Sequence, residues 1–175
     1  MERPIIMSTP MVQAILEGRK TQTRRVLKPH HRLYRVGDEL WVRETWIHTG
    51  EGIWTVSDAM RWPGKSLIRY KADGEKPGDQ WFPSIHMPRW ASRIMLKICE
   101  RSTQHIQDIS EDDAEAEGAT KLLMDDEGKF YEMPNGTYRT GFAGLWEHLN
   151  AKRGYGWDEN PEVIALKFEV VSNGR

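Results

Sequence analysis

Cysteine is nearly absent from this chain of 175 residues, which contains only Cys99. A single cysteine excludes an internal disulfide and any zinc site built from several cysteines. Cys99 lies in a segment of alternating apolar residues, so we expect a buried structural thiol. The six histidines are scattered along the chain, and metal sites need clustered ligands. We therefore expect no metal site and no cofactor.

Long hydrophobic runs are also missing. No apolar stretch approaches the roughly 20 residues that a membrane-spanning helix needs, and the N-terminal residues do not resemble a secretory signal. The apolar share of 38% and the charged share of 29% are typical of a polar, soluble globular protein. The sequence predicts a cytoplasmic protein without a membrane partner, folded as a single domain over residues 1–175.

The chain has little net charge, −1 with a pI of about 6.6, which excludes a generally basic nucleic-acid coat protein. The charges are nevertheless segregated. No acidic residue and seven basic ones lie between Gly18 and Gly37: Arg19, Lys20, Arg24, Arg25, Lys28, Arg32 and Arg35. Such a run produces a positive field suited to phosphate or another anion, and it is equally compatible with a solvated basic loop.

An acidic segment balances the basic one later in the chain. It contains Asp108, Glu111, Asp112, Asp113, Glu115 and Glu117. If the two segments meet in space, they form a charged cleft.

The pattern of apolar residues predicts the secondary structure. Strands are expected at 4–7, 21–27, 40–48, 66–71, 93–101 and 163–171. One helix begins at Ser8 or Thr9 and ends at Gly18, and a second is capped by Ser110 and ends at Gly118. A third, amphipathic helix contains Phe142, Leu145, Trp146 and Leu149 and ends near Gly154.

Two regions interrupt this pattern. Residues 49–85 are rich in Trp, Pro and Gly and indicate an insertion that decorates the core. Residues 120–140 indicate a loop or hairpin, with a turn at Asp126-Glu127-Gly128. The predicted class is α+β, a small mixed β-barrel of five to seven strands with about three short helices.

The segment Gly18-Arg19-Lys20-Thr21-Gln22-Thr23-Arg24-Arg25 resembles the signature of the ASCH domain, which has a PUA-like β-barrel. The residues from Asp108 to Gly118 resemble the second helix of that family. The stretches 37–46 and 87–93 are similar to its phage- and prophage-encoded branch, and the resemblance extends over roughly residues 3–48 and 86–171. It implies a PUA-like fold, and PUA domains bind RNA along a groove beside the barrel.

One bacterial branch of the ASCH family removes the acyl group from N4-acetylcytidine and related nucleosides. It uses a lysine as proton acceptor, a threonine three residues later as nucleophile, and a glutamate as proton donor. The resemblance places these roles on Lys20, Thr23 and Glu117. In that branch an aliphatic residue and an arginine follow the threonine, whereas this chain has Arg24-Arg25.

These residues are chemically suited to such roles. A threonine hydroxyl becomes a useful nucleophile when a nearby base takes its proton. A lysine serves as that base if desolvation or neighbouring cations lower its pKa from about 10.4. A carboxylate at a helix C-terminus, such as Glu117, opposes the helix dipole, which raises its pKa and favours a proton donor.

Other residues are candidates for binding the substrate. Arg25 or Arg43 could bind a carbonyl oxygen or a phosphate, and Arg24 is a further candidate for binding the substrate. Glu44 is a carboxylate in an otherwise apolar strand and therefore needs a partner. Trp46 is a candidate platform for base stacking, as are Trp81 and Trp90.

We therefore expect a protein that acts on a modified nucleoside or RNA, with amide hydrolysis of N4-acylated cytidine as the leading activity. Three alternatives remain at this stage. The chain could be an RNA-binding module without turnover, it could be a metal-dependent ribonuclease, or Lys20 and Glu117 could form a purely structural pair.

Overall fold

The computed structural model describes residues 1–125, 127, 129–133 and 135–172. The chain forms two compact units. Unit 1 contains residues 1–17, 37–97 and 169–172, and unit 2 contains residues 18–36 and 98–168. The chain passes between the units several times, so each is described by itself.

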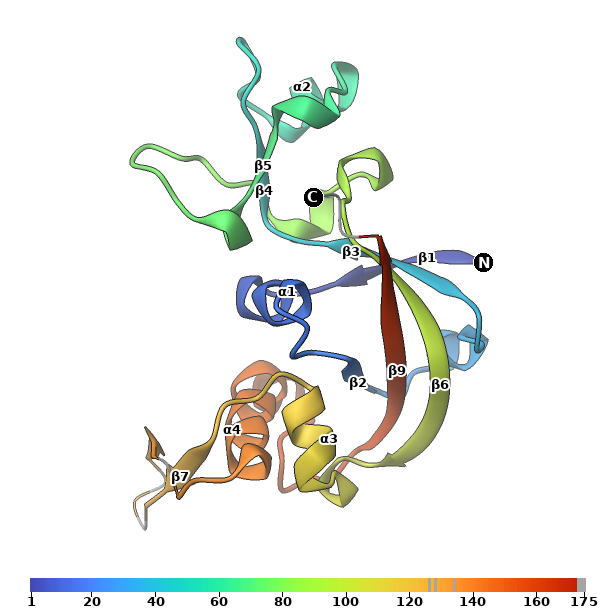
Figure 1. Cartoon of the computed structure of the whole chain (residues 1–175), viewed down its shortest axis with the longest axis vertical. Coiled ribbons are helices and arrows are strands. Elements are labelled where there is room, and N and C mark those ends of the chain that lie inside the picture. The colour runs from blue at the N-terminus through green and yellow to red at the C-terminus, as the bar shows by residue number, and fades with distance from the viewer. Residues whose placement is uncertain (126, 128, 134, 173–175) are drawn as a thin grey trace. The chain divides into compact units, whose positions relative to one another are not determined.

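Unit 1 begins with β1 (Glu2–Ile6) and α1 (Thr9–Leu16), followed later by β3 (Glu39–Arg43) and the first residues of β6 (Met95–His105) (Figure 1). β1 runs parallel to β3, and β3 runs antiparallel to β6. The predicted helix after β1 is confirmed: Pro10 lies in its first turn, and Gly18 follows it with a φ of 77°. That positive φ is the conformation in which glycine commonly follows a helix.

The prediction of one strand over residues 40–48 is wrong. β3 ends at Arg43, and β4 (Trp46–His48) pairs antiparallel with β5 (Ile68–Tyr70) in a separate two-stranded sheet. Burial nevertheless alternates without interruption through Leu40, Val42, Glu44 and Trp46. The alternation therefore identifies the inward-facing residues correctly, but it does not show that the chain changes sheets at Glu44.

The region predicted as an insertion has secondary structure and an apolar cluster of its own. It contains α2 (Val56–Arg61), a helix that the sequence analysis did not predict, capped by Thr55. Short 3-10 turns lie at Lys65–Leu67, Lys71–Asp73, Ser84–His86 and Arg89–Ala91. The buried cluster consists of Trp46, Ala59, Ile68, Tyr70, Met87 and Ala91.

Unit 2 contains β2 (Gln22–Val26), the rest of β6, and β9 (Glu162–Ser172) up to Phe168. A 3-10 turn lies at Pro29–Leu33. α3 (Glu111–Ala116) and α4 (Tyr138–Asn150) pack on each other, and α4 ends in a 3-10 turn at Ala151–Arg153. The core of unit 2 combines residues before, within and after these helices: Ile106, Ile109, Ala114, Ala119, Phe142, Trp146 and Val163.

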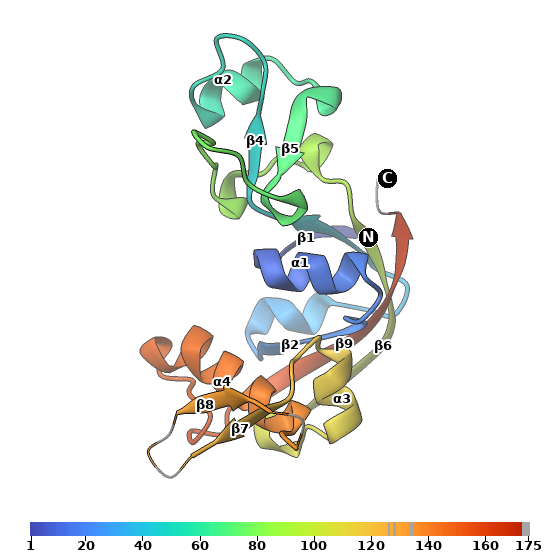
Figure 2. The ribbon, with the colours of Figure 1, turned by 60° about the vertical axis from the view of Figure 1, so that its left-hand side comes forward.

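The predicted excursion at 120–140 forms a hairpin of β7 (Leu122–Met124) and β8 (Phe130–Glu132) next to α4 (Figure 2). Asp126 and Gly128 of the predicted turn lie outside the described residues. Leu145 and Leu149, predicted on the apolar face of α4, are exposed, while Phe142 and Trp146 are buried. The buried face of α4 is therefore narrower than the spacing of its apolar residues indicates.

The α+β class is confirmed, with nine strands and four α-helices in the described part of the chain. The five-stranded sheet has the order β1-β3-β6-β9-β2 and mixes parallel and antiparallel pairs. With β1 and β2 as edge strands, the described sheet is open rather than a closed barrel. Cys99 is exposed, so the prediction of a buried thiol is wrong, because the alternation of β6 buries Leu96 and Ile98 and turns Cys99 outward.

Candidate functional site

Lys20 and Glu117, far apart in the sequence, meet inside unit 2. Lys20 lies between the Gly18 turn and the start of β2, and only 1% of its surface is exposed. Its amine lies 2.7 Å from Glu117 Oε2 and also donates a hydrogen bond of 2.8 Å to the Glu117 carbonyl oxygen. The basic and acidic segments of the sequence therefore meet, and they do so in a buried ion pair.

Local sequence explains the position of Glu117. Ser110 caps α3 by accepting a hydrogen bond from the Asp113 N–H. Acidic residues occupy the first turn, where their negative charges interact favourably with the positive end of the helix dipole. Glu117 is the C-cap residue, and Gly118 follows with a φ of 80°. The Thr21 N–H donates to the Ala116 carbonyl at 2.8 Å, and this bond attaches the end of α3 to the residue before β2.

Arg24 and Asp113 complete a buried network of charges. The Arg24 guanidinium donates to Glu117 Oε1 at 3.2 Å and to Asp113 Oδ2 at 2.7 Å. Gln22 donates to the other Asp113 oxygen at 2.7 Å and accepts a bond from Arg24 at 3.2 Å. Two cations, Lys20 and Arg24, thus form ion pairs with two carboxylates.

This environment changes the acidity of the groups. Burial lowers the pKa of Lys20 below its ordinary value, and the charges of Arg25 and Arg24 lower it further, while Glu117 opposes the change. Burial raises the pKa of Asp113, but the Gln22 hydrogen bond and the Arg24 charge outweigh that effect, and the pKa lies below its ordinary value. Burial also lowers the pKa of the half-buried Arg25, while the negative charge of Glu117 acts in the opposite direction by stabilising the guanidinium cation.

Thr23 lies in β2 opposite Leu166 of β9 and is buried, with 1% of its surface exposed. Strand alternation places Thr23 and Arg25 on one face of β2 and Gln22 and Arg24 on the other. Within the described residues, both hydrogen bonds of the Lys20 amine go to Glu117 and none goes to Thr23. Thr23 is therefore next to the charged network in the chain but not part of it.

The remaining sequence-predicted site residues belong to unit 1. Glu44 is buried and receives two parallel hydrogen bonds of 3.0 Å from Arg93. Arg93 also donates to Asp73 at 2.7 Å, and its guanidinium lies 4.0 Å from the centre of the Tyr70 ring. The partner that a buried carboxylate requires is therefore Arg93, which the sequence analysis did not identify.

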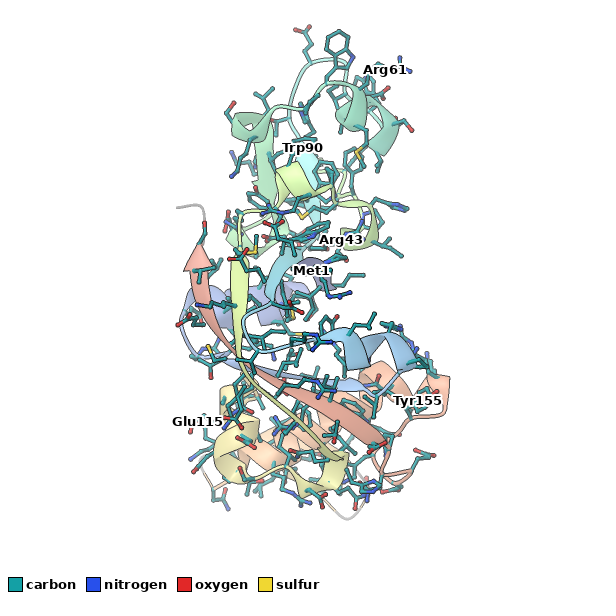
Figure 3. All side chains as sticks on the ribbon, turned by 90° about the vertical axis from the view of Figure 1, so that its right-hand side faces the viewer. Met1, Arg43, Arg61, Trp90, Glu115 and Tyr155 are labelled. Atoms are coloured by element: carbon teal, nitrogen blue, oxygen red, sulfur yellow. The ribbon has the colours of Figure 1, made fainter. Side chains whose placement is uncertain are left out.

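Arg43 and Trp46 are also engaged within unit 1. Arg43, labelled in Figure 3, donates to the carbonyl oxygens of Met87 and Ile85 and lies over the Trp41 ring. Trp46 is fully buried in the apolar cluster of the insertion and packs edge-on against Phe82 and Trp90. Its ring faces are covered by the core, which is the environment of a packing residue.

Sequence reasoning missed Asp113 and Gln22. Asp113 precedes Glu117 by four residues, a spacing that places both carboxylates on one face of a helix. Gln22 and Arg24 lie two positions apart, which places both on one face of a strand. These spacings group Asp113 with Glu117 and Gln22 with Arg24, but they do not show that the two groups face each other.

Among the described residues, no three side chains of His, Cys, Asp or Glu lie close enough together to hold a metal ion. None of the described helices combines the length and the apolar character needed to cross a membrane.

Comparison with known proteins gives similarity in structure only. The sequence matches no protein-family model and no curated protein. The structure is similar to a crystal structure of an Enterococcus faecalis V583 protein of the DUF984 family, with 14% identity, a TM-score of 0.46, and coverage of 92% of this chain and 66% of that one. It is also similar to an ASCH domain from Lactobacillus crispatus JV V101, with 15% identity, a TM-score of 0.44, and coverage of 93% and 70%.

Proposed function

We propose that this protein is an ASCH-type amidohydrolase that removes the acyl group from an N4-acylated cytidine. The observation that supports the proposal is the contact between the buried Lys20 amine and the Glu117 carboxylate. A base and an acid suited to amide hydrolysis lie 2.7 Å apart, on the two segments whose sequences resemble the ASCH signature.

The pair can supply both catalytic groups by moving one proton. Transfer of a proton from the Lys20 ammonium to Glu117 leaves a neutral amine, which is a base, and a protonated carboxyl, which is an acid. Burial favours the neutral amine, because it lowers the pKa of Lys20 below its ordinary value.

In the proposed reaction, the Thr23 hydroxyl gives its proton to the Lys20 amine, and its oxygen attacks the acyl carbon. The tetrahedral intermediate collapses by breaking the bond to N4 of cytidine, and Glu117 protonates the departing amine. Lys20 then passes its proton to the Glu117 carboxylate, which restores the neutral amine and the carboxylic acid. A water cleaves the acyl-threonine with Lys20 as base, and Lys20 gives the proton that it takes from the water to the departing threonine oxygen. The first step requires the Thr23 oxygen to lie within hydrogen-bond distance of the Lys20 amine when substrate is bound. Catalytic hydrogen bonds are often long in the free enzyme and shorten in the complex with substrate.

Arg24 supports the substrate-binding role that the sequence predicts for it. Its Nη atoms are occupied by the carboxylates, but its Nε is buried and has no acceptor among the described residues. A donor fixed in a buried site stabilises the negative charge that develops on a carbonyl oxygen. Arg24 Nε is therefore available to donate a hydrogen bond to a polar group of the substrate.

The test follows release of cytidine from N4-acetylcytidine by chromatography. Wild-type protein and Thr21→Ala, an exposed threonine two residues away, should turn over at similar rates. Thr23→Ala should lower kcat/KM by about a thousandfold, whereas Thr23→Ser should retain part of the activity. Absence of turnover in the wild type would overturn the proposal, and full activity of Thr23→Ala would exclude threonine as the nucleophile.

A second candidate function is RNA binding without turnover. The basic run is divided by the fold, because Lys20 and Arg24 are buried while Arg19, Lys28 and Arg35 are exposed. The exposed cations are the ones that can contact phosphates. This function predicts an affinity for RNA that falls with salt and weakens in Arg19→Ala and Lys28→Ala. An affinity that does not change with salt would contradict it.

A further inference from the structure

A hollow in the insertion of unit 1 has the composition of a ligand site. Its volume is about 630 Å³, and its wall combines polar, acidic and aromatic side chains with two backbone turns. The residues that matter here are His48, Glu51, Asp58, Trp62 and Gly64. They come from the end of β4, from α2, and from the turns on either side of α2.

His48 contributes a buried donor without an acceptor. Its Nδ1 accepts a hydrogen bond of 3.1 Å from the Gly50 N–H, which places the ring hydrogen on Nε2. Only 4% of His48 is exposed, and Nε2 has no hydrogen-bond partner among the described residues. Because buried donors are normally paired, this N–H indicates an acceptor supplied by a ligand.

Gly64 leaves the approach to this donor open. A methyl group at position 64 would lie 3.5 Å from His48 Nε2, in the space that an acceptor needs. The same methyl would meet only the end of the flexible Leu67 side chain, at 3.3 Å. The backbone of Gly64, with a φ of −148°, is one that alanine also adopts. The absence of a side chain here therefore matters for access rather than for the local fold.

Trp62 provides a flat aromatic wall. It is 67% exposed although it is one of the largest apolar side chains, and exposed tryptophans are suited to stacking on planar ligands. Asp58 and Glu51 add acceptors for ligand N–H groups: Asp58 Oδ2 is used by Trp54 and Thr55, while no hydrogen bond to Asp58 Oδ1 occurs within the described residues. A donor, acceptors and a stacking surface thus converge.

Two exposed cations are neighbours in the sequence of residues that line the hollow, and their charge suits a phosphate. The carboxylates inside the hollow repel phosphate, whereas Arg61 and Lys65, on either side of Trp62 and Gly64 in the sequence, are exposed cations. Arg61 is labelled in Figure 3, where its side chain points away from the ribbon. A base inside the hollow would present its phosphate to these cations.

We propose that the hollow formed by His48, Asp58, Trp62 and Gly64 binds an unpaired nucleobase. The base stacks on Trp62, accepts a hydrogen bond from His48 Nε2 and donates one to Asp58, while its phosphate lies near Arg61 and Lys65. The base belongs to a free nucleotide or to a single strand of nucleic acid. This site is separate from Lys20 and Glu117, and it does not depend on the proposed hydrolysis.

The test is titration of the full chain with nucleoside monophosphates by calorimetry, and with fluorescently labelled four-nucleotide single strands by anisotropy. Trp62→Ala should weaken binding by roughly five- to a hundredfold, the effect of losing one base–aromatic stack. Gly64→Ala should weaken it by about tenfold or more, because the His48 donor is then left unpaired in the complex. Trp54→Ala, a more exposed tryptophan outside the hollow, is the matched control and should bind within about twofold of the wild type.

The two kinds of probe show whether the bound nucleobase belongs to a free nucleotide or to a single strand of nucleic acid. Binding of monophosphates indicates a free nucleotide, and binding of the oligonucleotides alone indicates a single strand; both support the site. The proposal is overturned if no base-containing probe binds, or if Trp62→Ala binds like Trp54→Ala. It is also overturned if Gly64→Ala binds like the wild type while circular dichroism shows it folded, because His48 would then not contact the ligand.

Discussion

The Lys20–Glu117 pair is poorly explained by stability alone. Removing two charges from water costs several kcal/mol for each ion, and their attraction only offsets that cost when the geometry is good. Buried pairs replaced by apolar residues of similar volume often leave stability unchanged or increased. Burial of the pair therefore needs a reason other than stability, and a lysine whose pKa is lowered by burial is consistent with a role in proton transfer.

Breaking the pair on one side should be costly. Lys20→Met leaves Glu117 buried with Arg24 as its remaining cation, and we expect the free energy of unfolding to fall by about 3 kcal/mol. Urea denaturation measures the change. Lys152→Met, at an exposed lysine, is the control and should stay within about 0.5 kcal/mol. An unchanged stability in Lys20→Met would show that the pair is not formed in solution.

The lowered pKa of Lys20 also predicts how the rate of deacylation depends on pH. A general base acts when it is unprotonated, so kcat/KM for deacylation should rise with pH and level off below the ordinary lysine value of about 10.4. Lys20→Arg should lose this rise together with the activity, because a guanidinium keeps its proton. A pH-rate profile measured on both proteins, with Thr21→Ala as control, tests the assignment. The same rising limb in Lys20→Arg would assign the base to another residue.

At the scale of elements, α3 holds both carboxylates of the network in place. Asp113 faces Gln22 and Arg24 of β2, and Glu117 at the helix end faces Lys20. The helix itself was predictable, because Ser110 and Gly118 are strong signals at its two ends. The pairing of Arg24 was not predictable from local pattern, because it depends on which face of β2 the helix covers.

The ionisation of Asp113 should make the free energy of unfolding depend on pH in the acidic range. Its pKa is lower in the folded chain than in the unfolded one, so its contribution is complete above about pH 4 and is lost as the pH falls through the folded value. Asp113→Asn should lower the free energy of unfolding by about 2 kcal/mol at neutral pH and flatten its decline in acid. Denaturation measured across acidic pH tests this. An equal effect of Asp112→Asn, at an exposed carboxylate in the same helix, would contradict it.

The division of residues 40–48 shows a second limit of sequence pattern. Leu40, Val42, Glu44 and Trp46 alternate correctly, yet β3 and β4 belong to different sheets. Alternation reports which side chains are buried, and it does not report the hydrogen-bond partner of the backbone. Glu44 is buried because Arg93 from a distant segment pairs with it, and nothing in the local sequence identifies that residue.

At the scale of the whole molecule, each unit has a hydrophobic cluster of its own, and strands β6 and β9 pass from one unit to the other. Continuous strands transmit unfolding from one part of a sheet to another, because the ladder of hydrogen bonds is shared. We therefore propose that residues 1–175 unfold as one cooperative domain. In the sequence, the expectation of a single domain rests on the chain length and on the lack of an evident linker segment.

Native-state hydrogen exchange tests the cooperativity. The slowest amides of β3 in unit 1 and of β2 in unit 2 should exchange with the same opening free energy, equal to that of global unfolding. Two plateaus that differ by more than about 1 kcal/mol would show that the units unfold separately. The amides of the two-stranded sheet β4–β5 should exchange faster, because that sheet is small.

The central claim is that Lys20 is the base of an amidohydrolase. The most direct measurement is kcat/KM for release of cytidine from N4-acetylcytidine by wild type, Lys20→Ala and the exposed-lysine control Lys152→Ala. We predict turnover by wild type and Lys152→Ala, and a loss of at least about a hundredfold in Lys20→Ala. No turnover by the wild type, or equal turnover by Lys20→Ala, would contradict the claim.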